Sequence, residues 1–135
     1  MDKKASELLG EEVLAGVTLE AGSSVSKMIG GAVGIAVAGV DSIKAAVPGD
    51  HKGLHYAAVG PSKVGFFSLK RGLFKPSINE LLVERPRDEV AAVEIERGAM
   101  RPAHFVFEDG TDYVLLCARI NTKKLKKVKS LLTGE

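Results

Sequence analysis

HFVFEDGTDYVLLC, residues 104–117, consists of two short apolar runs on either side of an acidic turn. Its phenylalanine, valine and tyrosine residues favour strands. The Asp109-Gly110 pair favours a hairpin with a type I′ turn, in which both central residues take positive φ. Directly after this stretch Asn121 offers a helix N-cap, and residues 123–132 have helical periodicity. The sequence therefore predicts a β-hairpin that leads into a C-terminal helix.

Strand patterns also occur upstream of this hairpin, after a polar segment, residues 1–10, that fits a short helix. They cover residues 12–19, 54–59, 63–69 and 81–84. In the first run the residues on the apolar face are Val13, Ala15, Val17 and Leu19. Residues 87–97 fit either a strand or a helix, and the flanking Pro86 and Gly98 favour the strand. About seven strands predict an α+β, mainly β fold, in which a strongly bent antiparallel sheet or partly open barrel precedes a C-terminal helix.

Size, composition and charge are those of one globular domain, residues 1–135, with 45% hydrophobic and 27% charged residues. The net charge of the whole chain is only +2, but residues 119–135 alone have a net charge of +5, and the rest of the chain has −3. The single cysteine excludes an intrachain disulfide framework and suits a reducing compartment. The first residues, MDKK, lack the apolar core of a secretory signal. We therefore expect a cytoplasmic protein.

A glycine-rich segment, residues 24–47, follows the first predicted strand and is interpreted as a helical insertion. Small residues recur in it at every fourth position, which gives a helix a smooth groove that a second backbone can approach. The groove residues proposed for self-association are Ser26, Gly30, Gly34, Ala38 and Ser42. The 13 uncharged residues between Lys27 and Asp41 span about 20 Å as a helix, whereas a bilayer core measures about 30 Å, so a transmembrane helix is disfavoured. Packing on the protein's own sheet, contact with a second copy and insertion into a membrane interface stay open.

Candidate catalytic and metal-binding residues are few. His51 and His55 are four residues apart, but they lie in a loop that runs into a strand, and the sequence suggests no third metal ligand. Cys117 falls within a strand, where a small buried thiol is expected rather than a nucleophile. Two carboxylate pairs are interpreted as solvated positions. They are Glu94 with Glu96, and Glu108 with Asp109. We predict no catalytic, metal or cofactor site, and we expect that the chain is not an enzyme.

Motifs distributed along the chain carry a resemblance to a known family. They are GEEVLA at 10–15, AVGPSK at 58–63, PRDEV at 86–90, VEIERG at 93–98, the hairpin at 105–116 and the terminal helix. This set resembles the bacterial pleckstrin-homology-like (PH-like) domains, relatives of the PH and GRAM superfold. The resemblance implies a seven-stranded curved sheet capped by a C-terminal helix, with a non-enzymatic binding or assembly role. The glycine-rich insertion departs from that pattern.

The resemblance also implies candidate lipid-binding residues, because eukaryotic relatives often bind phosphoinositides through a basic loop between early strands. The residues in the comparable region are Lys63, Lys70, Arg71 and Lys75. In the familiar phosphoinositide spacing an arginine stands two places after a basic residue. Here Gly72 stands two places after Lys70, so the spacing differs.

The predicted C-terminal helix has an apolar side, with Leu125, Val128 and Leu132, and a basic side. The basic side consists of Lys123, Lys124, Lys126, Lys127 and Lys129. A solvated face and a surface for anionic lipid both fit this side, since each basic residue near such a membrane contributes about 1 kcal/mol. Nucleic-acid binding is disfavoured by an aromatic content of 5% and by the absence of a recognition motif in the sequence.

The sequence as a whole predicts a PH-like binding or assembly module. Its expected partners are a second copy of the chain, an unidentified protein, and an anionic membrane on the cytoplasmic side. The alternative is a monomeric sensor of anionic, phosphoinositide-like lipids. An enzyme and a nucleic-acid binder are less favoured alternatives. The lipid-binding candidates are Lys63, Lys70, Arg71, Lys75, Lys123, Lys124, Lys126 and Lys127.

Overall fold

The computed structural model of the chain describes residues 1–21 and 44–134, and within these ranges eight strands form one sheet. The strands are β1 (Ala15–Ala21), β2 (Lys44–Ala46), β3 (Gly53–Val59), β4 (Lys63–Lys70), β5 (Ser77–Pro86), β6 (Val90–Ile95), β7 (Met100–Phe107) and β8 (Thr111–Ala118). The helices are α1 (Asp2–Leu9) and α3 (Thr122–Thr133), with short 3₁₀ turns η1 (Pro48–Asp50), η2 (Arg87–Glu89) and η3 (Arg119–Asn121). The mainly β class with a C-terminal helix is therefore confirmed.

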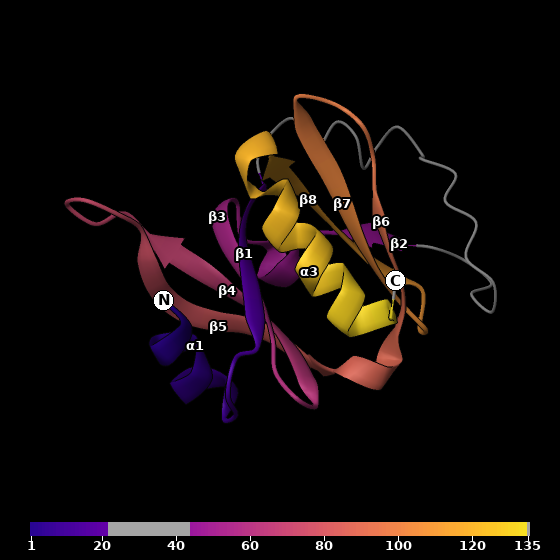
Figure 1. Cartoon of the computed structure of the whole chain (residues 1–135), viewed down its shortest axis with the longest axis horizontal. Helices are drawn as coiled ribbons and strands as arrows, with labels where there is room; N and C mark the ends of the chain where they lie inside the picture. Colours follow the sequence, from indigo (N-terminus) through magenta and orange to yellow (C-terminus); the bar gives the residue numbers. More distant parts are fainter. Residues whose placement is uncertain (22–43, 135) are drawn as a thin grey trace.

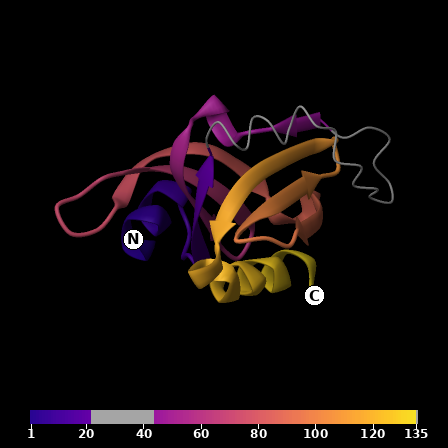
Figure 2. The same cartoon turned by 90° about the horizontal axis from the view of Figure 1, so that it is seen from above.

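The sheet is bent and open. Its strand order is β5-β4-β3-β1-β8-β7-β6, with antiparallel neighbours along this path, while β2 pairs with β8 in parallel. Among the described strands, no backbone ladder joins β5 to β6, so the path does not close on itself. α3 lies along one side of the bent sheet, as both views show (Figure 1, Figure 2).

Two apolar layers stabilise this arrangement. Between the two halves of the sheet, Phe66 and Phe105 pack with Leu125 and Val128 of α3, all fully buried. The residues of β1 predicted to face the core belong to these layers, and Val17 and Leu19 are at most 1% exposed. The second layer lies under α1, where Ala5 and Leu9 cover Tyr56 and Phe67. Each helix therefore buries one apolar face of the sheet, as the 3.6-residue periodicity of α3 predicts.

The turn between β7 and β8 differs from the predicted type I′ turn. Gly110 has φ 93°, but among non-glycine residues in the described ranges only Asp50 has positive φ, so Asp109 does not fit that turn. The loop has three residues, 108–110, and is closed by a hydrogen bond of 2.9 Å from the Gly110 N–H to the Phe107 carbonyl. The side chain of Asp109 also accepts the Thr111 N–H at 2.9 Å. A three-residue hairpin loop needs positive φ only at its last position, which here is glycine.

The predicted insertion helix at residues 24–47 is wrong for its last residues. Lys44–Ala46 form strand β2, which pairs with Thr111–Tyr113 at the start of β8. Strand β1 pairs with β8 at Glu20 and Leu116, so the start of β8 extends beyond β1 and its edge needs another partner. The earlier part of the insertion lies outside the described residues. So do all the self-association candidates, Ser26, Gly30, Gly34, Ala38 and Ser42.

The ambiguous segment 87–97 begins as the turn η2 and continues as a strand. β6 pairs antiparallel with β7, so the strand interpretation favoured by Pro86 and Gly98 is confirmed. The short N-terminal helix is confirmed as α1. The strand count in the described ranges is eight rather than about seven because β2 was not predicted.

Candidate functional site

The β4–β5 hairpin extends beyond the body of the protein in both views (Figure 1, Figure 2). Its ladder continues to the pair Lys70–Ser77, and residues 71–76, RGLFKP, form the loop. Lys70, Arg71 and Lys75 are exposed, and their side chains have no ion-pair or hydrogen-bond partner in the part of the chain that the structure describes. The hairpin therefore brings together three of the predicted lipid-binding residues.

The shape of this loop requires glycine at position 72. A Cβ atom added to Gly72 would lie 2.4 Å from the carbonyl oxygen of Lys75, which is too close for any other residue without a backbone shift. The side chains of Leu73 and Phe74 project into solvent and are 92% and 94% exposed. They line a depression together with Leu54 and the rest of the loop. Sequence reasoning missed these two residues, although bulky apolar residues in a basic turn between strands are themselves a signal.

Lys52 is a further cation at this end of the sheet. It directly precedes β3, whose first residues lie beside the last residues of β4 because the two strands are antiparallel, with His55 opposite Ser68. Lys52 is exposed, and its side chain has no partner among the described residues. Glu20, opposite Leu54, and Glu80, opposite Ser68, add two negative charges at this end. The hairpin end is thus mainly positive.

Lys63, the fourth candidate of this group, lies at the opposite end of β4. Its Nζ atom donates to the Leu9 carbonyl at 3.1 Å and pairs with Glu84 at 3.7 Å. The first and last of the eight residues of β4 are seven steps of about 3.3 Å apart, which is roughly 23 Å. The structure therefore does not bring Lys63 together with the hairpin cations.

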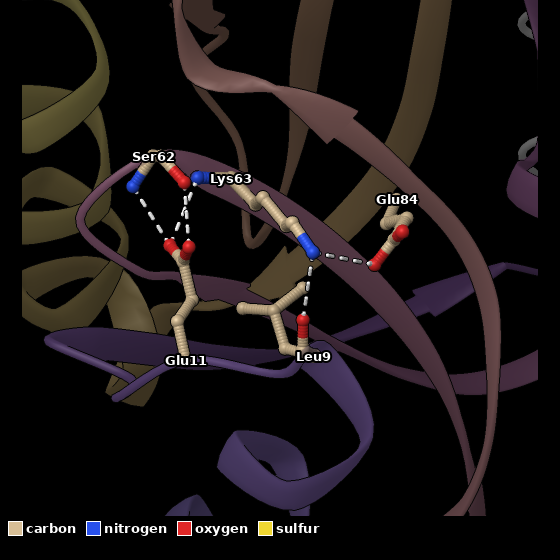
Figure 3. Close-up of polar contacts among 5 residues, drawn as sticks. All are labelled: Leu9, Glu11, Ser62, Lys63 and Glu84. Carbon is tan, nitrogen blue, oxygen red and sulfur yellow. Dashed lines mark hydrogen bonds and ion pairs between the residues drawn. The ribbon is translucent and has the colours of Figure 1, made fainter.

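The surroundings of Lys63 join the N-terminal segment to the turn between β3 and β4. Glu11 accepts the Ser62 N–H at 2.7 Å, the Ser62 hydroxyl at 2.5 Å and the Lys63 N–H at 3.0 Å (Figure 3). These hydrogen bonds lower the pKa of Glu11 below its ordinary value, and the bond from the Ser62 hydroxyl has the largest effect. The Glu11 side chain also passes within 2.3 Å of where a Cβ atom of Gly60 would stand. The contacts of Glu11 and Lys63 therefore stabilise the fold by joining the N-terminal segment to the β3–β4 turn.

The basic face of α3 is a separate surface. Leu125 and Val128 are buried, while four of the five lysines of the opposite side are exposed, as predicted. The exposed lysines are Lys123, Lys124, Lys126 and Lys127. Lys124 lines a pocket with Tyr56 and the first residues of α1. Both views place α3 away from the tip of the β4–β5 hairpin, so the two groups of candidate residues do not form one site (Figure 1, Figure 2).

His104 lies in a buried polar cluster that the sequence did not reveal. Its Nδ1 lies 2.8 Å from Asp112 Oδ2 and its Nε2 lies 2.7 Å from Glu96 Oε2. Burial by itself lowers the pKa of His104, but the hydrogen bonds and charges of the two carboxylates outweigh it, and the net pKa is raised. Both carboxylates are diagonal cross-strand neighbours of His104, which is opposite Glu94 and Val114. The cluster thus joins β6, β7 and β8, and its two carboxylates favour the protonated form of His104.

Of the two carboxylate pairs interpreted as solvated positions, Glu94, Glu108 and Asp109 are exposed as expected, whereas Glu96 is partly buried. Glu96 contacts His104, at the distance given above. Asp109 forms an ion pair of 2.7 Å with Arg85, and the hydrogen bond from Arg85 lowers the pKa of Asp109 to about 2. Arg85 also contacts Glu89 at 3.2 Å and lies 4.2 Å above the ring of Phe107.

The remaining candidates do not converge on a reactive centre. The rings of His51 and His55 are 5.2 Å apart, and burial lowers the pKa of His55, whose Nδ1 lies 3.0 Å from the Gly53 carbonyl. Cys117 is fully buried, and burial raises the pKa of its thiol. Within residues 1–21 and 44–134, no group of three or more His, Cys, Asp or Glu residues has a geometry that would hold a metal ion.

Comparison of the chain with protein-family models, with curated proteins and with solved structures found no match. Of the helices in the described ranges, none combines the length and the apolar character that crossing a bilayer requires.

Proposed function

We propose that the chain is a PH-like, non-enzymatic module that docks on anionic membrane surfaces through the end that carries the β4–β5 hairpin. The observation that carries this proposal is the set of cations on a projecting hairpin, Lys70, Arg71 and Lys75, with Lys52 beside them, none of which has a partner within the described residues. Cations that have no partner among the described residues are available to an external anion. Anionic lipids are concentrated in the cytoplasmic leaflet, which agrees with the expected cytoplasmic location.

Two further observations support the PH-like part of the proposal. Seven strands follow one antiparallel path with a C-terminal helix packed on it, which fits the curved sheet that the resemblance implies. β2 is an addition to that pattern. Assembly through the small-residue row is a separate expectation from the sequence, and it rests on residues outside the described ranges. The described geometry therefore favours membrane docking.

The strength of the electrostatic attraction depends on the number of cations. Each basic residue near an anionic membrane contributes about 1 kcal/mol, so four contribute roughly 4 kcal/mol, which corresponds to binding in the millimolar range. The attraction weakens as salt shortens the Debye length. We therefore expect weak, salt-sensitive binding from charge alone.

Co-sedimentation with vesicles tests the proposal. The protein is mixed with phosphatidylcholine vesicles, with or without phosphatidylserine, at low and high salt. The test variant carries Lys70→Gln, Arg71→Gln and Lys75→Gln. The matched control removes the same number of charges from α3, with Lys123→Gln, Lys124→Gln and Lys127→Gln.

We expect that the natural protein binds only the vesicles with phosphatidylserine, that the hairpin variant loses this binding, and that the α3 variant retains most of it. Absence of binding at low salt would refute the docking function. An equal loss in the α3 variant would instead place the docking surface on α3 or reduce it to overall charge.

A further inference from the structure

The tip of the β4–β5 hairpin carries two adjacent bulky apolar side chains that make no contribution to the core. Leu73 and Phe74 are 92% and 94% exposed, more than any other large apolar side chain in the described ranges. Ile120, in the turn η3 before α3, is next with 88%. Two neighbouring apolar residues in water at the most distant point of a hairpin favour neither folding nor solubility, and such positions commonly mark a contact surface.

The hairpin presents this pair on a pre-ordered support. Hydrogen-bonded strand pairing continues to Lys70 and Ser77, directly before and after the loop. The close approach of Gly72 to the Lys75 carbonyl then narrows the turn. Two register shifts interrupt the ladder, one at the middle of β4, between Phe66 and Phe67, and one nearer the tip, between Ser68 and Leu69. Such irregularities bend a strand and redirect the rest of the hairpin.

Charge around the pair indicates its partner. Lys70 and Arg71 precede the apolar residues and Lys75 comes directly after them, so the apolar tip is surrounded by cations. A bilayer with anionic lipids has the complementary order, with negative headgroups around an apolar interior. A second copy of the same tip would bring like charges together, which is unfavourable.

We propose that Leu73 and Phe74 insert below the headgroups of an anionic bilayer, so that the ligand of this hairpin is the membrane interface and not a soluble headgroup. This inference rests on the docking function proposed above and specifies its partner. The cations attract the hairpin to the surface, and the apolar pair enters the interface. Insertion adds a component of binding that salt does not weaken, because apolar burial is not electrostatic.

Replacement of the apolar pair separates this component from the attraction of charge. The double variant Leu73→Ser with Phe74→Ser retains every cation, and we expect it to bind anionic vesicles at least about tenfold more weakly, from the apolar area that no longer leaves water. Its fold should be unchanged, since the two side chains are exposed. Ile120→Ser is the matched control, because it removes an equally exposed apolar side chain beside Arg119. This control should bind as tightly as the natural protein.

Fluorescence locates the insertion directly. The chain contains no tryptophan, so Phe74→Trp introduces a single reporter at the tip. We expect its emission to shift to shorter wavelength on addition of vesicles with phosphatidylserine, and lipids brominated on their acyl chains should quench it. The reporter variant Ile120→Trp should show neither effect. Excess soluble glycerophosphoserine should not displace the protein from the vesicles.

The outcomes distinguish this inference from the docking function. Vesicle binding without a shift of the reporter at position 74 would refute insertion and leave electrostatic docking in place. A shift at position 120 instead of 74 would also refute insertion of the hairpin. Displacement by glycerophosphoserine would assign the site to a headgroup and overturn the inference. Failure of the natural protein to bind anionic vesicles at low salt would refute the docking function itself.

Discussion

Replacement of His104 tests how the β6–β8 part of the sheet is stabilised. The side chains of His104 and Asp112 are 2% and 4% exposed, so their contact of 2.8 Å lies away from water. The contact of His104 with Glu96, at 2.7 Å, is more open, since the Glu96 side chain is 37% exposed. The raised pKa of His104 means that the folded protein favours the imidazolium form.

This raised pKa makes the stability depend on pH in a defined direction. Because the folded pKa of His104 lies above the unfolded value of about 6.5, its stabilisation is complete below that value and is lost as pH rises through the folded pKa. His55, whose pKa burial lowers, affects the stability only below about pH 6.5. Cys117, whose pKa burial raises, contributes only above about pH 8.5. Between these limits the free energy of unfolding should fall as pH rises.

The size of the effect can be worked out from the two contacts. A hydrogen bond to a charged group stabilises a protein by about 1.5–3 kcal/mol, and the buried bond to Asp112 should contribute that amount. The bond to Glu96 is partly exposed, and solvent screening reduces it to less than about 1 kcal/mol. We expect His104→Gln to lower the free energy of unfolding by about 2–4 kcal/mol at pH 6.5 and by a smaller amount at pH 8.

Urea denaturation at a series of pH values between these limits measures the effect. The variant should show a nearly constant free energy of unfolding across the series, while the natural protein shows a decline. His51→Gln is the control, because His51 is partly exposed, and it should retain the decline. A natural protein whose stability is flat or rises with pH, or a His104→Gln variant with the same decline, would refute the stabilising role of the imidazolium.

Two further substitutions test other contacts. Arg87 donates to the carbonyls of Gly60 and Pro61 at 3.0 and 3.2 Å and to a carbonyl near the end of α3. In urea denaturation, Arg87→Ala should therefore lower the free energy of unfolding by about 1.5–3 kcal/mol. The control Arg97→Ala, at an exposed position, should lower it by less than about 0.5 kcal/mol. Gly16→Ala would place a Cβ atom 2.2 Å from the hydroxyl of Tyr56, so we expect it to lower the free energy of unfolding by about 1–3 kcal/mol. In a protein that already carries Tyr56→Ala, the same substitution should cost much less, because the clash is gone. If the two substitutions had simply additive effects, the predicted clash would be contradicted.

The strands were predictable where local patterns agree with their environment. In residues 12–19 every second residue from Val13 to Leu19 is apolar, and these side chains form the buried side. β2 was not predictable, because Lys-Ala-Ala has no strand preference and continues the small-residue pattern that favoured a helix. Its conformation depends on the edge of β8, which is distant in the sequence. The turn type was ambiguous for a related reason, since Asp-Gly fits loops of two and of three residues, and the register of β7 with β8 decides between them.

The charges of the candidate site were predicted in part, because the sequence grouped Lys63 with the hairpin cations and missed Lys52, and neither the apolar residues nor the polar cluster was predicted. Position along the chain sufficed to group Lys70 with Lys75, because a short hairpin keeps them together. The exposure of Phe74 depends on how far the hairpin extends beyond the body, which no local pattern encodes. The contact of His104 with Asp112 depends on register, and a shift by one residue would turn the histidine to the other face.

The two ends of the β4–β5 hairpin have different roles, and this makes stability and docking separately testable. At the end near Lys63, side chains join the hairpin and the turn that follows it to other elements, since Arg85 of β5 reaches Asp109 in the β7–β8 turn and Arg87 of η2 reaches the end of α3. At the other end, the loop from 71 to 76 has exposed cations and an exposed apolar pair, whose side chains stabilise nothing in the described fold. Changes at Arg85 should therefore lower the stability, whereas changes at Phe74 should weaken membrane binding and leave the stability unchanged. If the whole hairpin only stabilised the fold, substitutions at either end would lower the free energy of unfolding.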